Sequence, residues 1–321
     1  MSRSIRLLLA VGLVAAFSAC SRPPQLGHQE SRSEQGRQPE ALIAERELSG
    51  VMLSQALRNP FAVAVDMRGS VYVCDAGNNR LIKLDTDLIP IKDHGGFGSA
   101  PGLLSSPAYL SVDNGLNLWV SETGNRRLSR FDSELNFVDQ LDFADDSDLL
   151  KFGTPSGVAA TEYGTLWVAD RDKNRIAVFN NVGKFEQFVG DFGFSGGQLS
   201  QPEKLVLFGQ ENYAVCDPGN GRVAMYDSYG NFMRQVADFT IKAPVACAFA
   251  GPDLWVLDRS GSLACFSSSG RKLFQTGPLL TGNAVALKGP SDLAVLARDR
   301  LLIADSGNDR LLLCQIVYQQ P

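Results

Sequence analysis

Histidine is the scarcest of the chemically useful residues in this chain: among 321 residues there are two, His28 and His94. A zinc site usually takes three or four ligands from His, Cys and acidic side chains. Because only His94 lies in the repeated part of the sequence described below, a histidine-rich zinc enzyme is not expected. A Ser-His-Asp triad in the repeats would also depend on His94.

Basic charge, long apolar runs and paired cysteines are also in short supply. The chain has 30 Lys and Arg against 35 Asp and Glu, a net charge of −5. This acidic balance argues against a nucleic-acid partner, because non-specific binding to phosphates needs a basic stripe. The six cysteines form no C-x-x-C or C-x-x-C-H motif, so neither a redox relay nor covalent haem is indicated. The five cysteines after Cys20 are expected to be buried free thiols.

The N-terminus has the order of a secretory signal: Arg3 and Arg6, an apolar run from Leu7 to Phe17, then Ser18-Ala19-Cys20. The run of about 11 residues is too short to span a hydrocarbon layer of ~30 Å. We therefore assign residues 1–19 to a signal peptide. Plain secretion after cleavage near Ala19 is the simplest alternative.

The end of this signal resembles the bacterial lipobox, in which cleavage leaves a lipid-bearing cysteine as the first residue. Here that residue is Cys20, and the departure from the pattern is Phe17, where an aliphatic residue is usual. The resemblance, with Ser21 after the cysteine, implies an exported outer-membrane lipoprotein that faces the periplasm or the cell surface. Residues 20–46 are rich in Ser, Gln, Glu, Arg and Pro and lack apolar periodicity, which predicts a flexible tether.

From residue 60 the chain is built of six copies of one pattern, separated by 42 to 48 residues. Each copy starts at a proline: Pro60, Pro107, Pro155, Pro202, Pro244 and Pro290. Fifteen residues later stands an acid, and five residues further an arginine. The pairs are Asp75 and Arg80, Glu122 and Arg127, Asp170 and Arg175, Asp217 and Arg222, and Asp305 and Arg310. The fifth copy has Asp258 after fourteen residues and Ser262 in place of the arginine.

Within each copy, apolar residues alternate with period two after the proline, which predicts a strand buried on both faces. A second strand such as Val71-Tyr72-Val73 follows, and the acid and arginine flank the turn into a third. Gly-Asn occupies this turn in four copies, as suits left-handed backbone. All three tryptophans lie at one position of the second strand, where we expect packing between sheets and not an aromatic binding ring.

Four-stranded sheets repeated every 40–50 residues indicate a β-propeller. The copies resemble NHL repeats, most clearly in the glycine-rich connector from Gly190 to Pro202 and its second version from His94 to Pro107. The resemblance implies an all-β, six-bladed propeller of four-stranded antiparallel blades over residues 47–321, expected to be a monomer. The last copy lacks an outer strand, and residues 48–53 are predicted to supply it and close the ring.

The acid–arginine pairs are interpreted as structural, because a device made in every repeat is seldom catalytic. Specificity is expected where the copies differ, on the face that carries the prolines and the acid–arginine turns. The outliers define the candidate ligand or partner face: Tyr109, Arg171, Asp172, Lys173, Glu203, Lys204 and Asp292.

The first functional hypothesis is a lipid-anchored, non-catalytic module that binds a protein, peptide or glycan and needs no cofactor or metal. The alternative is a calcium-dependent hydrolase or lyase, similar to six-bladed lactonases, that uses the central channel. RNA binding, which the NHL resemblance would allow, is disfavoured by the export signal and by the acidic balance.

Overall fold

The computed structural model describes residues 38–113, 117–143, 151–161, 163–209, 211–238, 240–277, 280 and 285–319. These belong to one compact unit, Arg37–Pro321. The predicted signal peptide and lipidated Cys20 lie outside the described residues. Among those residues, no helix is long and apolar enough to cross a membrane.

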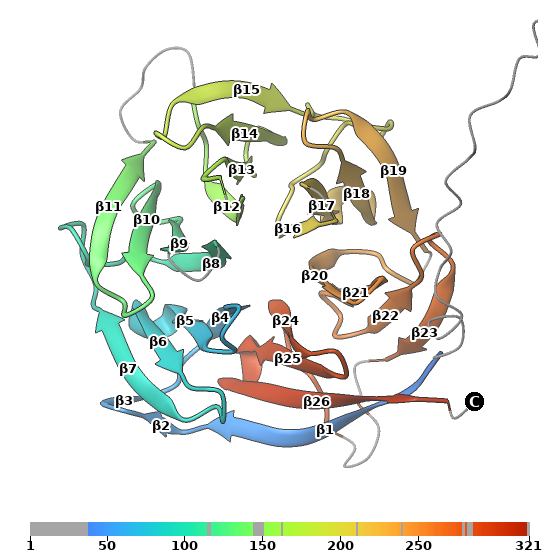
Figure 1. Cartoon of the computed structure of the whole chain (residues 1–321), viewed down its shortest axis with the longest axis horizontal. Helices are drawn as coiled ribbons and strands as arrows, with labels where there is room; N and C mark the ends of the chain where they lie inside the picture. Colours follow the sequence, from blue (N-terminus) through green and yellow to red (C-terminus); the bar gives the residue numbers. More distant parts are fainter. Residues whose placement is uncertain are drawn as a thin grey trace, which may run out of the picture. The chain divides into compact units, whose positions relative to one another are not determined.

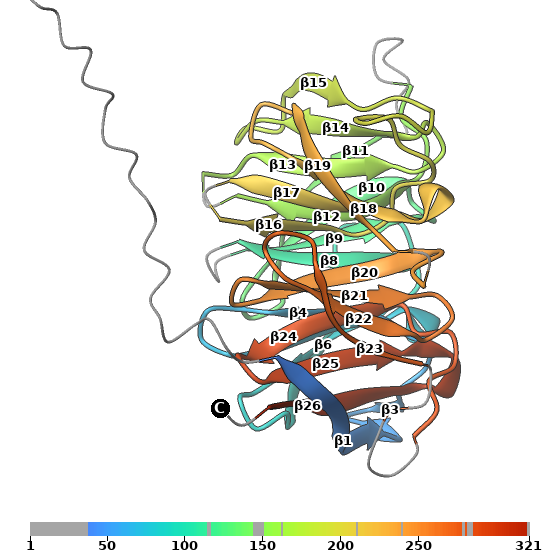
Figure 2. The same ribbon diagram turned by 90° about the vertical axis from the view of Figure 1, so that its right-hand side faces the viewer.

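Six four-stranded antiparallel sheets surround a common axis, which confirms the six-bladed propeller (Figure 1). Figure 2, turned by 90°, shows the ring from the side, with the strands running between its two faces. Blades 1 to 3 consist of β4 (Pro60–Val65), β5 (Val71–Asp75), β6 (Arg80–Leu84) and β7 (Pro90–Gly95); β8 (Pro107–Asp113), β9 (Asn117–Glu122), β10 (Arg127–Asp132) and β11 (Phe137–Asp142); and β12 (Pro155–Ala160), β13 (Leu166–Asp170), β14 (Arg175–Phe179) and β15 (Phe185–Val189).

Blades 4 and 5 follow the same order, and blade 6 takes its fourth strand from the N-terminal part of the unit. Their strands are β16 (Leu205–Phe208), β17 (Asn212–Asp217), β18 (Arg222–Tyr226) and β19 (Phe232–Ala237); β20 (Pro244–Ala250), β21 (Asp253–Asp258), β22 (Leu263–Phe266) and β23 (Lys272–Thr276); and β24 (Asp292–Ala297), β25 (Arg300–Asp305), β26 (Arg310–Tyr318) and β1 (Pro39–Ser49). A small hairpin, β2 (Val51–Met52) and β3 (Gln55–Ala56), joins β1 to blade 1.

The hydrophobic core lies between neighbouring blades. One cluster joins Trp167 of β13 to Tyr213 of β17, and the two rings stack with centroids 3.7 Å apart. Trp119 and Trp255 are buried as well, so all three tryptophans pack between sheets as expected. The five cysteines in the described residues are buried and form no disulfide with one another.

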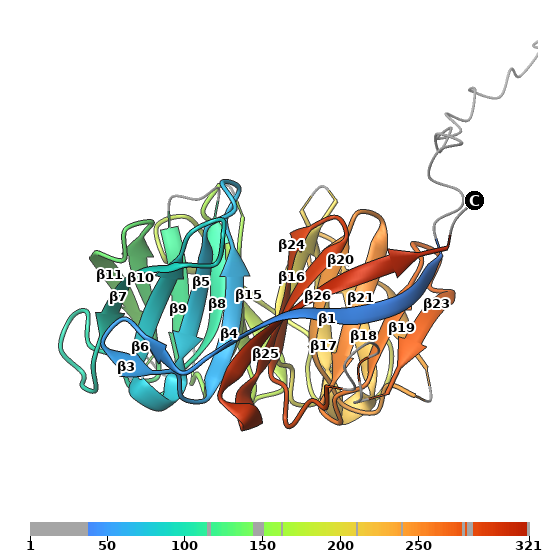
Figure 3. The ribbon, with the colours of Figure 1, turned by 90° about the horizontal axis from the view of Figure 1, so that it is seen from below.

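The ring is closed by β1, which pairs antiparallel with β26 from Pro39 opposite Tyr318 to Ser49 opposite Arg310 (Figure 3). Leu42 and Ala44 of β1 enter the core between blades 5 and 6, and Leu48 enters the core next to blade 1. Closure by an N-terminal strand is therefore confirmed.

The position of this strand differs from the predicted residues 48–53 at both ends: Val51–Met52 belong to the hairpin strand β2, and β1 ends at Ser49. It begins at Pro39, so residues 39–46 are strand and the predicted tether of residues 20–46 is too long at its C-terminal end. The pairing shifts register between Ala44 and Arg46, and three consecutive charged residues, Glu45 to Glu47, are exposed there. This bulge interrupts the period-two pattern, which is the signal by which a strand is found in a sequence.

Loss of β1 is expected to destabilise the whole ring, because β26 would become an unpaired edge and Leu42 would leave an open core. A chain that starts at Val51 should melt on the order of 10 °C below one that starts at Gln38, as removal of a buried leucine alone costs about 2–5 kcal/mol. Thermal unfolding followed by circular dichroism measures this. Equal melting temperatures for the two truncations would show that β1 is dispensable.

Candidate functional site

One end of the propeller, called here the turn face, carries the turn after the second strand of each blade, the connectors at residues 95–106 and 190–203, and the starts of the inner strands. They share this end because successive strands of a blade alternate in direction. Side chains bind the turns to the connectors: Asn125 donates to the carbonyl of Gly98 at 2.9 Å, and Asn220 donates to that of Gly193 at 2.9 Å.

The acid of every blade accepts a backbone N–H from the segment that leads to the inner strand. In blade 4, for example, Asp217 accepts from Ser200 at 2.7 Å and from Arg222 at 2.8 Å, and Arg222 also donates to the carbonyl of Ser195 at 3.0 Å. Burial raises the pKa of Asp217. The five predicted pairs are ion pairs of 2.7–3.4 Å: Asp75–Arg80, Glu122–Arg127, Asp170–Arg175, Asp217–Arg222 and Asp305–Arg310.

In the fifth blade, which lacks the arginine, Asp258 accepts two backbone N–H groups, from Lys242 at 2.8 Å and Ala243 at 2.7 Å. The acid therefore fixes the connector in all six blades, with or without a cation. The acids and arginines of the turns therefore have a structural role, because their polar groups already make hydrogen bonds and ion pairs within the blades.

A buried ion pair crosses the centre of the ring. Lys204, at the start of blade 4, contacts the carboxylate of Asp292 in blade 6 and donates to the carbonyl of Leu293 at 2.9 Å. Asp292 also accepts the N–H of Val63 in blade 1 at 3.0 Å. Burial raises the pKa of Asp292, an effect that Lys204 opposes. Two predicted face residues thus tie blades 1, 4 and 6 together at the centre of the ring.

Nearer the solvent, Glu203 joins two arginines from the neighbouring blades. Its Oε1 lies 2.5 Å from a terminal nitrogen of Arg259 in blade 5 and 3.3 Å from one of Arg171 in blade 3. Glu203 itself is buried, whereas the arginine side chains keep 52% and 40% of their surface exposed. We call Arg171, Glu203 and Arg259 the arginine cluster.

Arg259 was not among the predicted residues, although the sequence contains a signal for it. The residue directly after the acid is small or proline in four blades: Ala76, Thr123, Pro218 and Ser306. In blades 3 and 5 it is arginine. Comparing the copies at this position, in addition to the positions after the proline, would have identified both arginines of the arginine cluster.

Tyr109 is buried in blade 2, with its ring edge-on to Phe61 at 5.4 Å. Burial raises the pKa of its hydroxyl, and the nearby carboxylates of Glu203 and Asp292 raise it further. Within the described part of the chain, this hydroxyl has no hydrogen-bond partner. Of the remaining predicted residues, Lys173 is exposed and Asp172 accepts a hydrogen bond from Thr154 at 2.5 Å.

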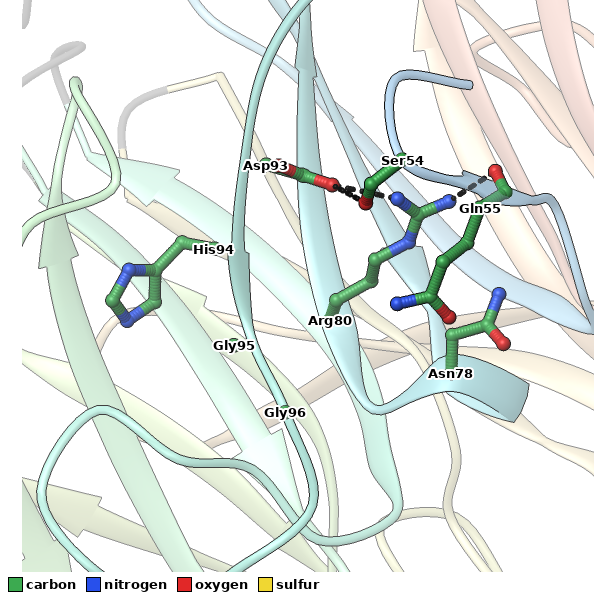
Figure 4. Close-up of a pocket in the computed structure, with 8 residues that line it drawn as sticks. All are labelled: Ser54, Gln55, Asn78, Arg80, Asp93, His94, Gly95 and Gly96. Carbon is green, nitrogen blue, oxygen red and sulfur yellow. Dashed lines mark hydrogen bonds and ion pairs between the residues drawn. The ribbon is translucent and has the colours of Figure 1, made fainter. Parts of the chain in front are cut away.

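A pocket of about 320 Å³ lies beside blade 1, away from this cluster, between the β2–β3 hairpin and β7 (Figure 4). In it Asp93 accepts hydrogen bonds from Ser54 at 3.0 Å and from Arg80 at 2.7 Å. His94 points away from these groups (Figure 4), lies 5.4 Å from the ring of Phe131 and contacts the carbonyl of Gly102 at 3.1 Å. Ser54, His94 and Asp93 therefore do not form a triad.

No group of three or more His, Cys, Asp and Glu side chains is arranged to hold a metal ion within the residues that the structure describes. The positive groups of the channel instead lie against its carboxylates. A calcium ion takes six to eight oxygen ligands, and here Lys204 and the two arginines stand next to the acids that could contribute such oxygens.

Comparison with known proteins agrees with this architecture. The family model of the NHL repeat matches residues 152–179, which include β12 to β14. The chain is a six-bladed β-propeller that contains an NHL repeat. The protein brain tumor of Drosophila melanogaster is 26% identical to it over 96 residues, which make up 29% of this chain and 9% of that protein. The match thus spans less than a tenth of the length of this curated relative.

Solved structures show that the same fold serves different tasks. Virginiamycin B lyase from Staphylococcus aureus superposes with a TM-score of 0.60 at 14% identity, covering 86% of the propeller chain and 99% of the lyase. A chain of the nidogen/laminin complex superposes with a TM-score of 0.55 at 14% identity, covering 75% and 93%. One of these neighbours is an enzyme and the other is part of a protein complex, so the likeness establishes the fold alone.

The Lys204–Asp292 pair leads to a pH-dependent prediction. Replacing Lys204 by Met leaves the buried carboxylate of Asp292 unpaired, which should cost about 3–5 kcal/mol at pH 8. A carboxyl whose pKa is raised by folding stabilises the native state as the pH falls, so the deficit should shrink at pH 5. Urea unfolding at both pH values measures it, with Lys184→Met, an exposed lysine, as control. If the loss of stability of Lys204→Met were the same at both pH values, the charge of Asp292 would not be its cause.

Proposed function

We propose that this protein is a non-catalytic interaction module that binds a protein, peptide or glycan partner on its turn face. The observation that carries the proposal is the state of the channel carboxylates. Asp292 is held by Lys204 and two backbone N–H groups, and Glu203 is held by two arginines. A general base needs a free carboxylate within reach of its substrate, and these acids are already engaged. The exposed groups at the mouth are donors suited to binding.

The N-terminal sequence supports the location that we propose for this module. The charged, apolar and small-residue order ends at Cys20, so we infer a lipid on Cys20 that holds the propeller at the outer membrane, facing the periplasm or the cell surface. Such an anchor gives a binding module a local concentration at the membrane without any contact by the propeller itself.

The alternative is a lyase or hydrolase that uses calcium in the central channel. It is supported by the shared fold with virginiamycin B lyase, and it requires calcium to bind beside Lys204 and the arginine cluster. Because these cations repel a divalent ion, a binding module agrees better with the channel as it stands.

Site-specific photocrosslinking in native membranes tests the binding face. A crosslinker at Lys173, on the turn face, should capture a partner, whereas one at Tyr229, in the exposed turn between β18 and β19 at the opposite end, should not. The purified protein, prepared without chelator, should carry far less than one calcium or zinc per chain. Stoichiometric metal together with absence of crosslinks at Lys173 would favour the enzyme.

The anchor is tested separately by metabolic labelling with a radioactive fatty acid. The full chain should incorporate label and sediment with membranes, and Cys20→Ala should do neither, because the thiol is the attachment point. Cys314→Ala, which removes a buried thiol of β26, is the matched control and should keep the label. Label retained by Cys20→Ala would contradict a lipoprotein.

A further inference from the structure

The arginine cluster has more hydrogen-bond donors than its single carboxylate can use. A guanidinium carries five N–H donors, yet within the described residues each of the two side chains contacts the protein only through one terminal nitrogen, and both contact the same oxygen, Oε1 of Glu203. Because the side chains of Arg171 and Arg259 are 40% and 52% exposed, their remaining donors are open to solvent. With two cations and one anion, the cluster keeps one net positive charge.

An independent feature beside the cluster also lacks a partner. Tyr109 is nine-tenths buried or more, and its hydroxyl makes no hydrogen bond to any residue that the structure describes. Glu203, Asp292 and Arg171 lie near enough to act electrostatically on this hydroxyl, as does Cys216, so it lies near the cluster. Although the side chain is buried, its hydroxyl oxygen keeps access to solvent, so a ligand that accepts a hydrogen bond can reach it.

We propose that Arg171, Arg259 and Tyr109 form a subsite for a single carboxylate, supplied by an acidic side chain or the C-terminus of a peptide partner. Arginine binds carboxylates with two parallel hydrogen bonds, and both guanidinium groups have free N–H donors for this purpose. This inference rests on the proposed role as an interaction module and specifies the chemistry that the turn face recognises.

Two observations favour a peptide with one acid over a polyanion such as an acidic glycan. The chain is acidic overall, with a net charge of −5, which repels polyanions, and the cluster offers a single net positive charge. In addition, the connector that ends at Glu203 carries two exposed aromatic side chains, Phe192 and Phe194, with 61% and 74% of their surface accessible. Both belong to a connector of the turn face, where they offer contacts to apolar side chains of a peptide, as large exposed aromatic groups often mark interaction sites.

A positional-scanning octapeptide library tests the subsite on the full propeller. Wild type should prefer sub-libraries with Asp or Glu fixed over those with Asn or Gln fixed. In Arg171→Gln and Arg259→Gln, binding of the acidic sub-libraries should weaken about ten-fold. Arg271→Gln removes an exposed arginine from the turn between β22 and β23, at the opposite end. It is the matched control and should bind like wild type.

A second variant separates recognition from folding. Glu203→Gln keeps the shape of the side chain but removes the anion that competes for the arginines, so acidic peptides should bind several-fold more tightly. A purely structural role of the arginine cluster predicts weaker binding instead, which would overturn the proposal.

Two other results would overturn the subsite. If peptides bind without preference for an acid, the proposed binding function is retained and the carboxylate subsite is rejected. A glucuronate polymer could bind through the arginines while no peptide does, which would point to a glycan. If the crosslinker at Lys173 captures no partner, the proposed function itself fails, independently of these outcomes.

Discussion

The carboxylate at the end of each second strand is the constraint on which the rest of the propeller depends. It accepts the backbone N–H of the segment that leads to the inner strand of its own blade, as Asp217 does from Ser200. This bond fixes where the inner strand begins, and so which residues reach the axis. Removing such an acid from water is unfavourable, as the raised pKa of Asp217 and Asp170 shows, and the arginine five residues later offsets part of that cost.

The same arrangement explains where variety is tolerated. The side chain of the residue directly after the acid is not part of the acid–arginine pair, although its backbone N–H bonds the connector in blades 2, 3 and 5. In blade 6 this residue is Ser306, which donates to the carbonyl of Pro60 at 2.6 Å and seals the junction between the last blade and the first. In blades 3 and 5 it is arginine, and both side chains converge on Glu203. The position directly after the acid therefore has two uses. In blade 6 it links the last blade to the first, and in blades 3 and 5 it supplies the two exposed arginines.

The sequence was sufficient to predict features that are encoded within a single repeat. It was insufficient to predict contacts that form only when the ring is closed. Strand order, tryptophan packing and the acid–arginine pairs follow from patterns within 50 residues. The partnership of Lys204 with Asp292 joins residues 88 positions apart, and no local pattern indicates it. Both residues were expected on the ligand or partner face because the copies differ at their positions, yet they are buried as a pair. The start of β1 was missed because a bulge interrupts its alternation.

Closure of the ring by β1 and the ion pair at the centre of the ring depend on the same blade. Blade 6 is completed by β1, and its inner strand β24 supplies Asp292, which holds blades 1 and 4 through Val63 and Lys204. If β26 lost its partner, β24 would be less firmly placed and Asp292 would lose its fixed position at the axis. The arginine cluster starts at Glu203, the residue directly before Lys204. Loss of β1 can therefore affect the arginine cluster through residues at the centre of the ring. The path leads from Asp292 to Lys204 and from there to the adjacent Glu203, and it does not involve the hydrophobic cores between the other blades.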